Sequence, residues 1–152
     1  MAHRSVWSAI FLFLYLYFFL GLNRRFFLIG LNELGLLFLA GILIAINWYG
    51  FIYAVTSGNA LQASLGYYIF PLVAVFLGIV FKREKFTIIQ TLAICLVIIS
   101  VVSLIYMNGE VPGLALILAF SFGFYGLIKS NVKLNPISSV TYETILITPL
   151  VI

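Results

Sequence analysis

Residues 34–56, LGLLFLAGILIAINWYGFIYAVT, form an apolar stretch without a charged residue, and this stretch decides the fold class. A helix needs about 20 such residues to cross the hydrocarbon core of a bilayer. Five further apolar stretches predict spans at residues 6–22, 63–81, 86–107, 111–128 and 138–152. Barrel strands would instead be short and alternating. The sequence therefore predicts an all-α, polytopic transmembrane bundle of about six helices.

The composition excludes an ordinary soluble domain. Hydrophobic residues make up 64% of the 152 residues and charged residues only 8%, and the mean hydropathy is +1.24. Soluble domains usually carry about a quarter charged residues. The net charge of +4 comes from short loops between apolar stretches, so we expect a lipid bilayer as the main partner and no nucleic acid.

The charged loops predict how the chain is oriented. The basic loop residues fall into three groups, Arg24 and Arg25, then Lys82, Arg83 and Lys85, and then Lys129 and Lys133. The loops at 57–62 and 108–110 contain no lysine or arginine. Because positive loops stay in the cytoplasm, the N-terminus is expected outside, as if a preceding helix were missing. The last span is short, so both ends look cut from a longer chain.

Asn47 and Trp48 are the first candidates for a solute pathway, because they lie near the middle of the second span. Lipid cannot satisfy an amide, so such a side chain faces a cavity or another helix. An amide beside aromatic faces could hold a planar, partly polar solute. Alternatively, Asn47 simply forms a hydrogen bond to a neighbouring helix.

Pro71 lies in the third span and predicts a helix kink, since proline lacks an N–H donor and clashes with the preceding turn. The kink would free the carbonyl of Tyr67 and turn Ser64 and Tyr67 toward the protein interior. A kink that only improves packing explains the same residue.

Glu143 is the one carboxylate inside a predicted span. A carboxylate there is costly, so it either binds a proton or a cationic substrate, or pairs with Lys129 or Lys133. His3 is the only histidine, and no serine, histidine and acid set lies within the spans. The sequence therefore predicts no metal site, no cofactor and no catalytic residues.

Several short motifs are distributed over nearly the whole chain. They are His3-Arg4 with Trp7-Ser8, Asn47-Trp48, Tyr53-Ala54-Val55, Ala63-Ser64-Leu65-Gly66-Tyr67 with Pro71-Leu72, Ala119-Phe120-Ser121-Phe122-Gly123-Phe124-Tyr125-Gly126, and Tyr142-Glu143-Thr144 with Pro149. Together these motifs resemble the RarD-type branch of the EamA drug/metabolite transporter superfamily.

The resemblance implies a ten-helix carrier made of two five-helix repeats of opposite orientation. This chain resembles helices two to seven, so residues 1–107 would supply four spans of the first repeat and 108–152 the start of the second. The resemblance also implies that the central pathway is lined by Arg4, Asn47, Trp48, Tyr67 and Glu143. Two positions depart from the family pattern, which usually has glutamate at Gln62 and asparagine at Phe70.

The expected function is transport of small metabolites or drugs by alternating access, in a bacterial cytoplasmic membrane. The expected partners are an unknown small-molecule solute and either a second polypeptide or further copies of the chain, since a pathway needs walls from both repeats. The alternative is a truncated or decayed membrane protein, or a helical subunit, without transport activity of its own.

Overall fold

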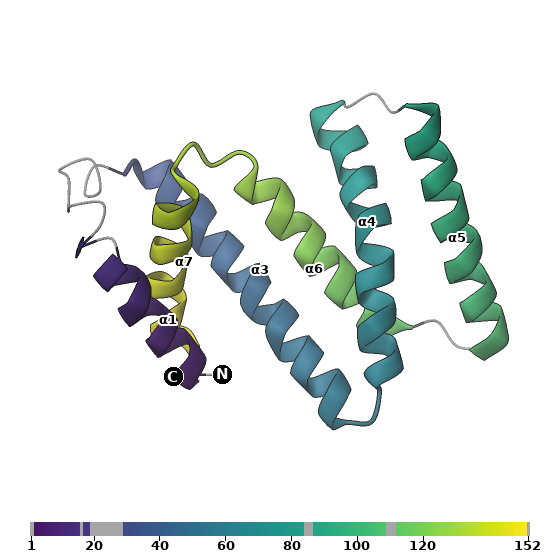
Figure 1. Cartoon of the computed structure of the whole chain (residues 1–152), viewed down its shortest axis with the longest axis horizontal. Helices are drawn as coiled ribbons and strands as arrows, with labels where there is room; N and C mark the ends of the chain where they lie inside the picture. The colour runs from purple at the N-terminus through teal and green to yellow at the C-terminus, as the bar shows by residue number, and fades with distance from the viewer. Residues whose placement is uncertain (1, 16, 19–28, 84–86, 109–111, 152) are drawn as a thin grey trace. The chain divides into compact units, whose positions relative to one another are not determined.

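The computed structural model describes residues 2–15, 17–18, 29–83, 87–108 and 112–151. Over these ranges the chain is helical and contains no strand, which confirms the all-α prediction. The α-helices are α1 (Ala2–Tyr15), α3 (Leu31–Thr56), α4 (Ala60–Lys82), α5 (Ile88–Asn108), α6 (Gly113–Lys129) and α7 (Pro136–Val151), as Figure 1 shows.

The predicted spans and the observed helices agree best where the apolar stretches are longest. Three described helices are long and apolar enough to cross a membrane, namely α3, α4 and α5. Helix α6 is apolar but has 17 residues, while α1 has 14 and α7 has 16. The chain is thus a helical membrane bundle with multiple passes, and crossings by α1, α6 and α7 stay predictions.

The first span was predicted at residues 6–22, of which residues 16 and 19–22 lie outside the described residues. Helix α1 begins at Ala2 and ends at Tyr15. It begins earlier because polar residues such as His3 and Arg4 can occupy a first helical turn outside the apolar stretch, and hydropathy alone does not register this.

The turn between α3 and α4 shows how local sequence ends a helix. Gly58 adopts φ of +81°, a conformation that glycine tolerates without steric cost. Its N–H donates to the carbonyl of Val55 at 3.3 Å, and the N–H of Asn59 donates to that of Ala54 at 2.7 Å. This pair of bonds is a Schellman motif, which reverses the direction of the chain between α3 and α4.

The helices form two compact units, described here separately. One unit comprises residues 46–127 and the other comprises residues 1–45 and 128–152. In the unit of residues 46–127, α4 and α5 run side by side (Figure 1). The same unit contains the C-terminal part of α3 and nearly all of α6.

The core of the 46–127 unit lies between α4 and α6. Its larger buried cluster consists of Leu65, Ile69, Val73 and Leu77 from α4 with Ala115 and Ala119 from α6. The four α4 residues recur every fourth position and so form one stripe on the helix. Alanines opposite them allow the two backbones to come close, as is usual for helices packed within membranes.

Leu118 of α6 is fully enclosed in this unit, with 2% of its surface exposed. It packs with Ala54 of α3 and Ala63 of α4. Two glycines leave the space that the Leu118 side chain occupies. A Cβ built on Gly66 would lie 2.8 Å from Leu118 Cβ, and one built on Gly50 would lie 3.2 Å from Leu118 Cδ2. Leu118 therefore fixes the approach of three helices.

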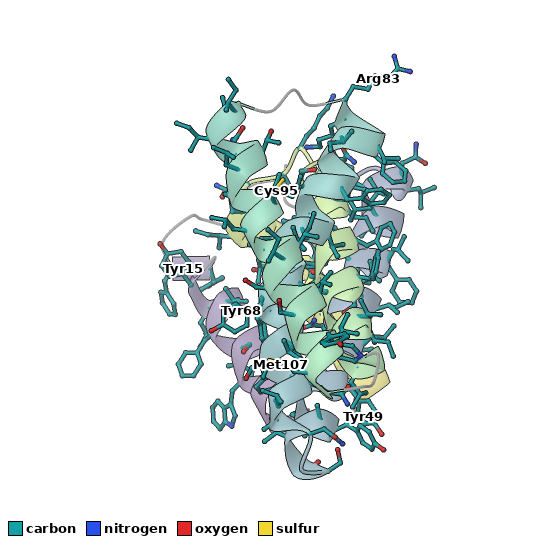
Figure 2. The ribbon with its side chains drawn as sticks, turned by 90° about the vertical axis from the view of Figure 1, so that its right-hand side faces the viewer. Tyr15, Tyr49, Tyr68, Arg83, Cys95 and Met107 are labelled. Atoms are coloured by element: carbon teal, nitrogen blue, oxygen red, sulfur yellow. The ribbon has the colours of Figure 1, made fainter. Side chains whose placement is uncertain are left out.

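Helix α5 differs from its neighbours in having no buried residue in its apolar window. Figure 2 shows two of its side chains, Cys95 and Met107, on the outside of the ribbon, and both are exposed. A helix that is apolar on every side is typical of a membrane environment. This surface is the expected contact with lipid tails.

In the unit of residues 1–45 and 128–152, α1 and α7 lie side by side (Figure 1). The N-terminal part of α3 also reaches α7, where a Cβ on Gly41 would lie 2.7 Å from Ile147 Cδ1 and 3.6 Å from Glu143 Cγ. Thr141 is fully buried, and its hydroxyl donates to the carbonyl of Ile137 at 2.8 Å.

Gly66→Ala should destabilise the 46–127 unit by about 1–3 kcal/mol, because the new methyl group overlaps Leu118 Cβ, which cannot move without its helix. Gly126→Ala is the control, since nothing lies within 4 Å of its built Cβ, and it should leave stability unchanged or raise it. Thermal unfolding of the purified chain in detergent measures both. Equal midpoints for the two variants would contradict the proposed close packing.

Candidate functional site

Asn47 lies on α3 with only 2% of its surface exposed. Its Nδ2 donates to the carbonyl of Leu118 at 2.9 Å and to Ser121 Oγ at 3.2 Å. The Ser121 hydroxyl donates in turn to the Leu118 carbonyl at 3.1 Å. Of the two alternatives from the sequence, a hydrogen bond to a neighbouring helix is the one present. A contact of Asn47 with solute stays a prediction.

Ser64, Tyr67 and Pro71 share one exposed side of α4. The Tyr67 side chain is 46% exposed and meets Phe51 of α3 edge-on, with ring centroids 5.8 Å apart. The Ser64 hydroxyl donates to the carbonyl of Ala60 in its own helix at 3.2 Å. Among the described residues, therefore, neither Ser64 nor Tyr67 is enclosed. Trp48, on α3, is half-buried.

Helix α4 is continuous through Pro71. The proline ring is exposed, and its nitrogen can donate no bond to the carbonyl of Tyr67. The kink therefore stays a prediction. The Tyr67 carbonyl that it would free belongs to the same exposed side of α4 as Ser64.

The two departures from the family pattern both bridge α4 and α6. Gln62 Oε1 accepts a hydrogen bond from the N–H of Leu114 at 3.3 Å, which satisfies one of the unpaired donors in the first turn of α6. Phe70 packs on Phe122, with ring centroids 4.7 Å apart, and Phe122 stacks on Tyr125 at 5.8 Å. Both positions therefore contribute contacts between α4 and α6 in this chain.

Glu143 forms an ion pair in the unit of residues 1–45 and 128–152. Lys129 Nζ donates to Glu143 Oε2 at 2.7 Å and to Ser139 Oγ at 2.6 Å. Glu143 is 4% exposed and Ser139 is 2% exposed. The sequence left cation binding and lysine pairing as alternatives, and the structure shows pairing with Lys129, while Lys133 is exposed.

Two of the predicted pathway residues, Asn47 and Glu143, form polar contacts with other helices. Asn47 meets Ser121, and Lys129 meets both Glu143 and Ser139. The side chain of Arg4 lies outside the described residues, although its backbone belongs to α1.

The sequence pattern alone did not identify Ser121 and Ser139 as partners of Asn47 and Lys129. Ser121 is the single serine in the apolar stretch of residues 119–126, and the rule that polar groups in spans form hydrogen bonds across helices would have marked it. Ser139 lies one helical turn before Glu143, a spacing that places both on one face of a helix.

Comparison with known sequences identifies the family of this chain. The EamA-like transporter family profile matches residues 1–106. The chain belongs to the EamA-like transporter family. This confirms the resemblance read from its motifs, and the RarD-type branch is supported by individual relatives.

Three bacterial relatives illustrate the similarity. The uncharacterized transporter YojE of Bacillus subtilis is 43% identical over 159 residues, covering 99% of this chain and 52% of YojE. Protein RarD of Escherichia coli is 35% identical, covering 98% of this chain and 51% of RarD. Protein RarD of Streptomyces exfoliatus is 37% identical, covering 95% and 46%.

The chain spans about half the length of these curated relatives. No solved structure matches it significantly. The family and the YojE relative carry the names of transporters, not of enzymes.

Asn47→Leu should lower the stability of the 46–127 unit by roughly 0.6 to 2 kcal/mol, because it removes two donors to α6 from a buried site. Ile46→Leu is the control, since Ile46 is 45% exposed on the same helix. Thermal unfolding in detergent reads both variants. An Asn47→Leu midpoint equal to that of Ile46→Leu would show that the amide contributes nothing to packing.

Lys129→Met should destabilise the other unit by about 3 kcal/mol, because it leaves the Glu143 carboxylate buried without its cation. The double variant Lys129→Met/Glu143→Gln should recover most of the loss, since neither charge remains. Lys133→Met, which removes an exposed charge from the loop that follows α6, should have little effect. The measurement is the yield of membrane-inserted protein and its thermal midpoint. If the losses in yield and thermal midpoint of the double variant equal the sum of the losses in Lys129→Met and Glu143→Gln, direct pairing is contradicted.

Proposed function

We propose that this chain is part of a carrier that moves small metabolites or drugs across the bacterial cytoplasmic membrane by alternating access. The observation that supports it most strongly is the match of residues 1–106 to a transporter family. In such carriers two repeats rock about a site near the middle of the membrane and expose it to each side in turn.

The exposed side of α4 is the part of the described structure best suited to line the pathway. It carries the hydroxyls of Ser64 and Tyr67. Polar groups in a span are costly against lipid and usually face protein or a water-filled cavity. Helix α5, in contrast, is strongly apolar and has no buried residue in its apolar window, so its outer side suits lipid. We therefore assign solute contact to the α4 side that bears Ser64, Tyr67 and Pro71.

The other pathway residues are proposed because their motifs resemble those of the family. Trp48 borders Asn47 on α3, Glu143 lies on α7, and Arg4 lies on α1. The family match ends at residue 106, which supports a first repeat over 1–107 and a second that begins at 108. The second wall of the pathway would come from another polypeptide or from further copies of this chain.

A transport assay without a known solute tests the proposal. Liposomes containing the chain, alone or with the C-terminal half of the Bacillus subtilis relative, are loaded with a bacterial metabolite extract. Mass spectrometry then identifies solutes that leave faster than from empty liposomes. We expect protein-dependent loss of a small set of solutes when both polypeptides are present, and little loss with the chain alone.

Tyr67→Ala should reduce that loss at least several-fold, because it removes a ring and a hydroxyl from the proposed pathway. Tyr68→Ala is the matched control, since Tyr68 is 68% exposed and projects from the ribbon in Figure 2, but it has no ring contact with Phe51 among the described interactions. Equal loss in the two variants would remove the α4 side from the pathway. No solute-specific loss in either preparation would contradict transport itself.

A further inference from the structure

The contacts of Lys129 show what kind of group the neighbouring acceptors bind. Its ammonium donates one hydrogen bond to the Ser139 hydroxyl and a second to the Glu143 carboxylate. Both distances, 2.6 and 2.7 Å, are at the short end for a nitrogen donor, as charge-assisted bonds usually are.

The two acceptors are held in place by the fold. Ser139 and Glu143 lie one turn apart on α7, so a single helix face presents them both. Each is more than nine-tenths buried. A Cβ built on Gly41 of α3 would lie 3.6 Å from Glu143 Cγ, an ordinary van der Waals distance, so α3 lies directly against the stem of Glu143.

The donor, in contrast, reaches these acceptors from a different helix. Lys129 is the last residue of α6, and its side chain is 19% exposed whereas that of Glu143 is 5% exposed. Lysine carries its charge on a four-carbon stem with three donor hydrogens. The Lys129 ammonium of α6 therefore binds two acceptors whose positions are set by another helix, α7.

We propose that Ser139 and Glu143 form a binding site for a primary ammonium group, and that Lys129 is its resident occupant. The carboxylate supplies the charge, and the hydroxyl supplies a second acceptor at one side. A primary alkylammonium or the ammonium ion itself can satisfy both acceptors. A quaternary ammonium has no N–H and cannot. Any cationic ligand that uses Glu143 must first displace Lys129.

Chemical rescue tests this proposal without reference to transport. Lys129→Ala removes the three outer carbons and the ammonium, which n-propylammonium replaces closely. The variant is placed in phosphatidylcholine nanodiscs, and its thermal midpoint is measured with n-propylammonium chloride or tetramethylammonium chloride at equal ionic strength. The midpoint of Lys129→Ala should rise with n-propylammonium concentration, as it does for any ligand that binds only the folded state. Tetramethylammonium should leave it unchanged.

Three controls define the site. The wild-type chain should not respond, because Lys129 fills the site. Lys129→Ala/Glu143→Gln should not respond, because the carboxylate is gone, and Lys133→Ala should behave as wild type. Equal responses to the two ammonium salts, or a response that persists without Glu143, would overturn the proposal.

If Lys129→Ala fails to fold, a second experiment tests the proposed site. Cell-free synthesis into nanodiscs is then carried out with and without n-propylammonium, and folded protein is quantified by size-exclusion chromatography. Recovery that depends on both n-propylammonium and Glu143 supports the site. No recovery, or equal recovery with Glu143→Gln in the same background, contradicts it.

Discussion

The constraint on which this structure depends is that a bilayer offers no water to polar groups. Each backbone N–H and carbonyl in the hydrocarbon must find a partner within the protein. Helices meet this demand locally, so the described chain consists of helices and short turns. The few polar side chains within them follow the same rule. Asn47 donates to α6, Glu143 accepts from Lys129, and Thr141 donates back to its own helix.

Because polar contacts are few, close packing holds the helices together. Without a hydrophobic drive between helices in lipid, small residues that bring backbones together matter most. Leu118 illustrates this, since it occupies the space that Gly50 and Gly66 leave open. Packing on one side of α4 also leaves the other side, with Ser64 and Tyr67, available for the proposed pathway. Fold and proposed function thus use different faces of one helix.

The sequence predicted the helices well because length and hydropathy are properties of a single stretch of chain. The pairing of Glu143 with a lysine was also within reach, since few cations lie near that span. The sequence did not distinguish Lys129 from Lys133, because the choice depends on where the α6–α7 turn directs each side chain. Nor did it reveal that Gln62 and Phe70 would join α4 to α6, since contacts across helices depend on rotation about the helix axes.

The most direct test of the account is the orientation of the loops, because a bundle that spans the membrane must place alternate turns on opposite sides. In a Cys95→Ala background, Ser57→Cys and Ser130→Cys place one thiol in each kind of loop, and both serines are exposed. A membrane-impermeant maleimide is then applied to intact cells. The account predicts labelling of Ser57→Cys in intact cells and of Ser130→Cys only after permeabilisation. Labelling of both thiols in intact cells, or the reverse pattern, would contradict it.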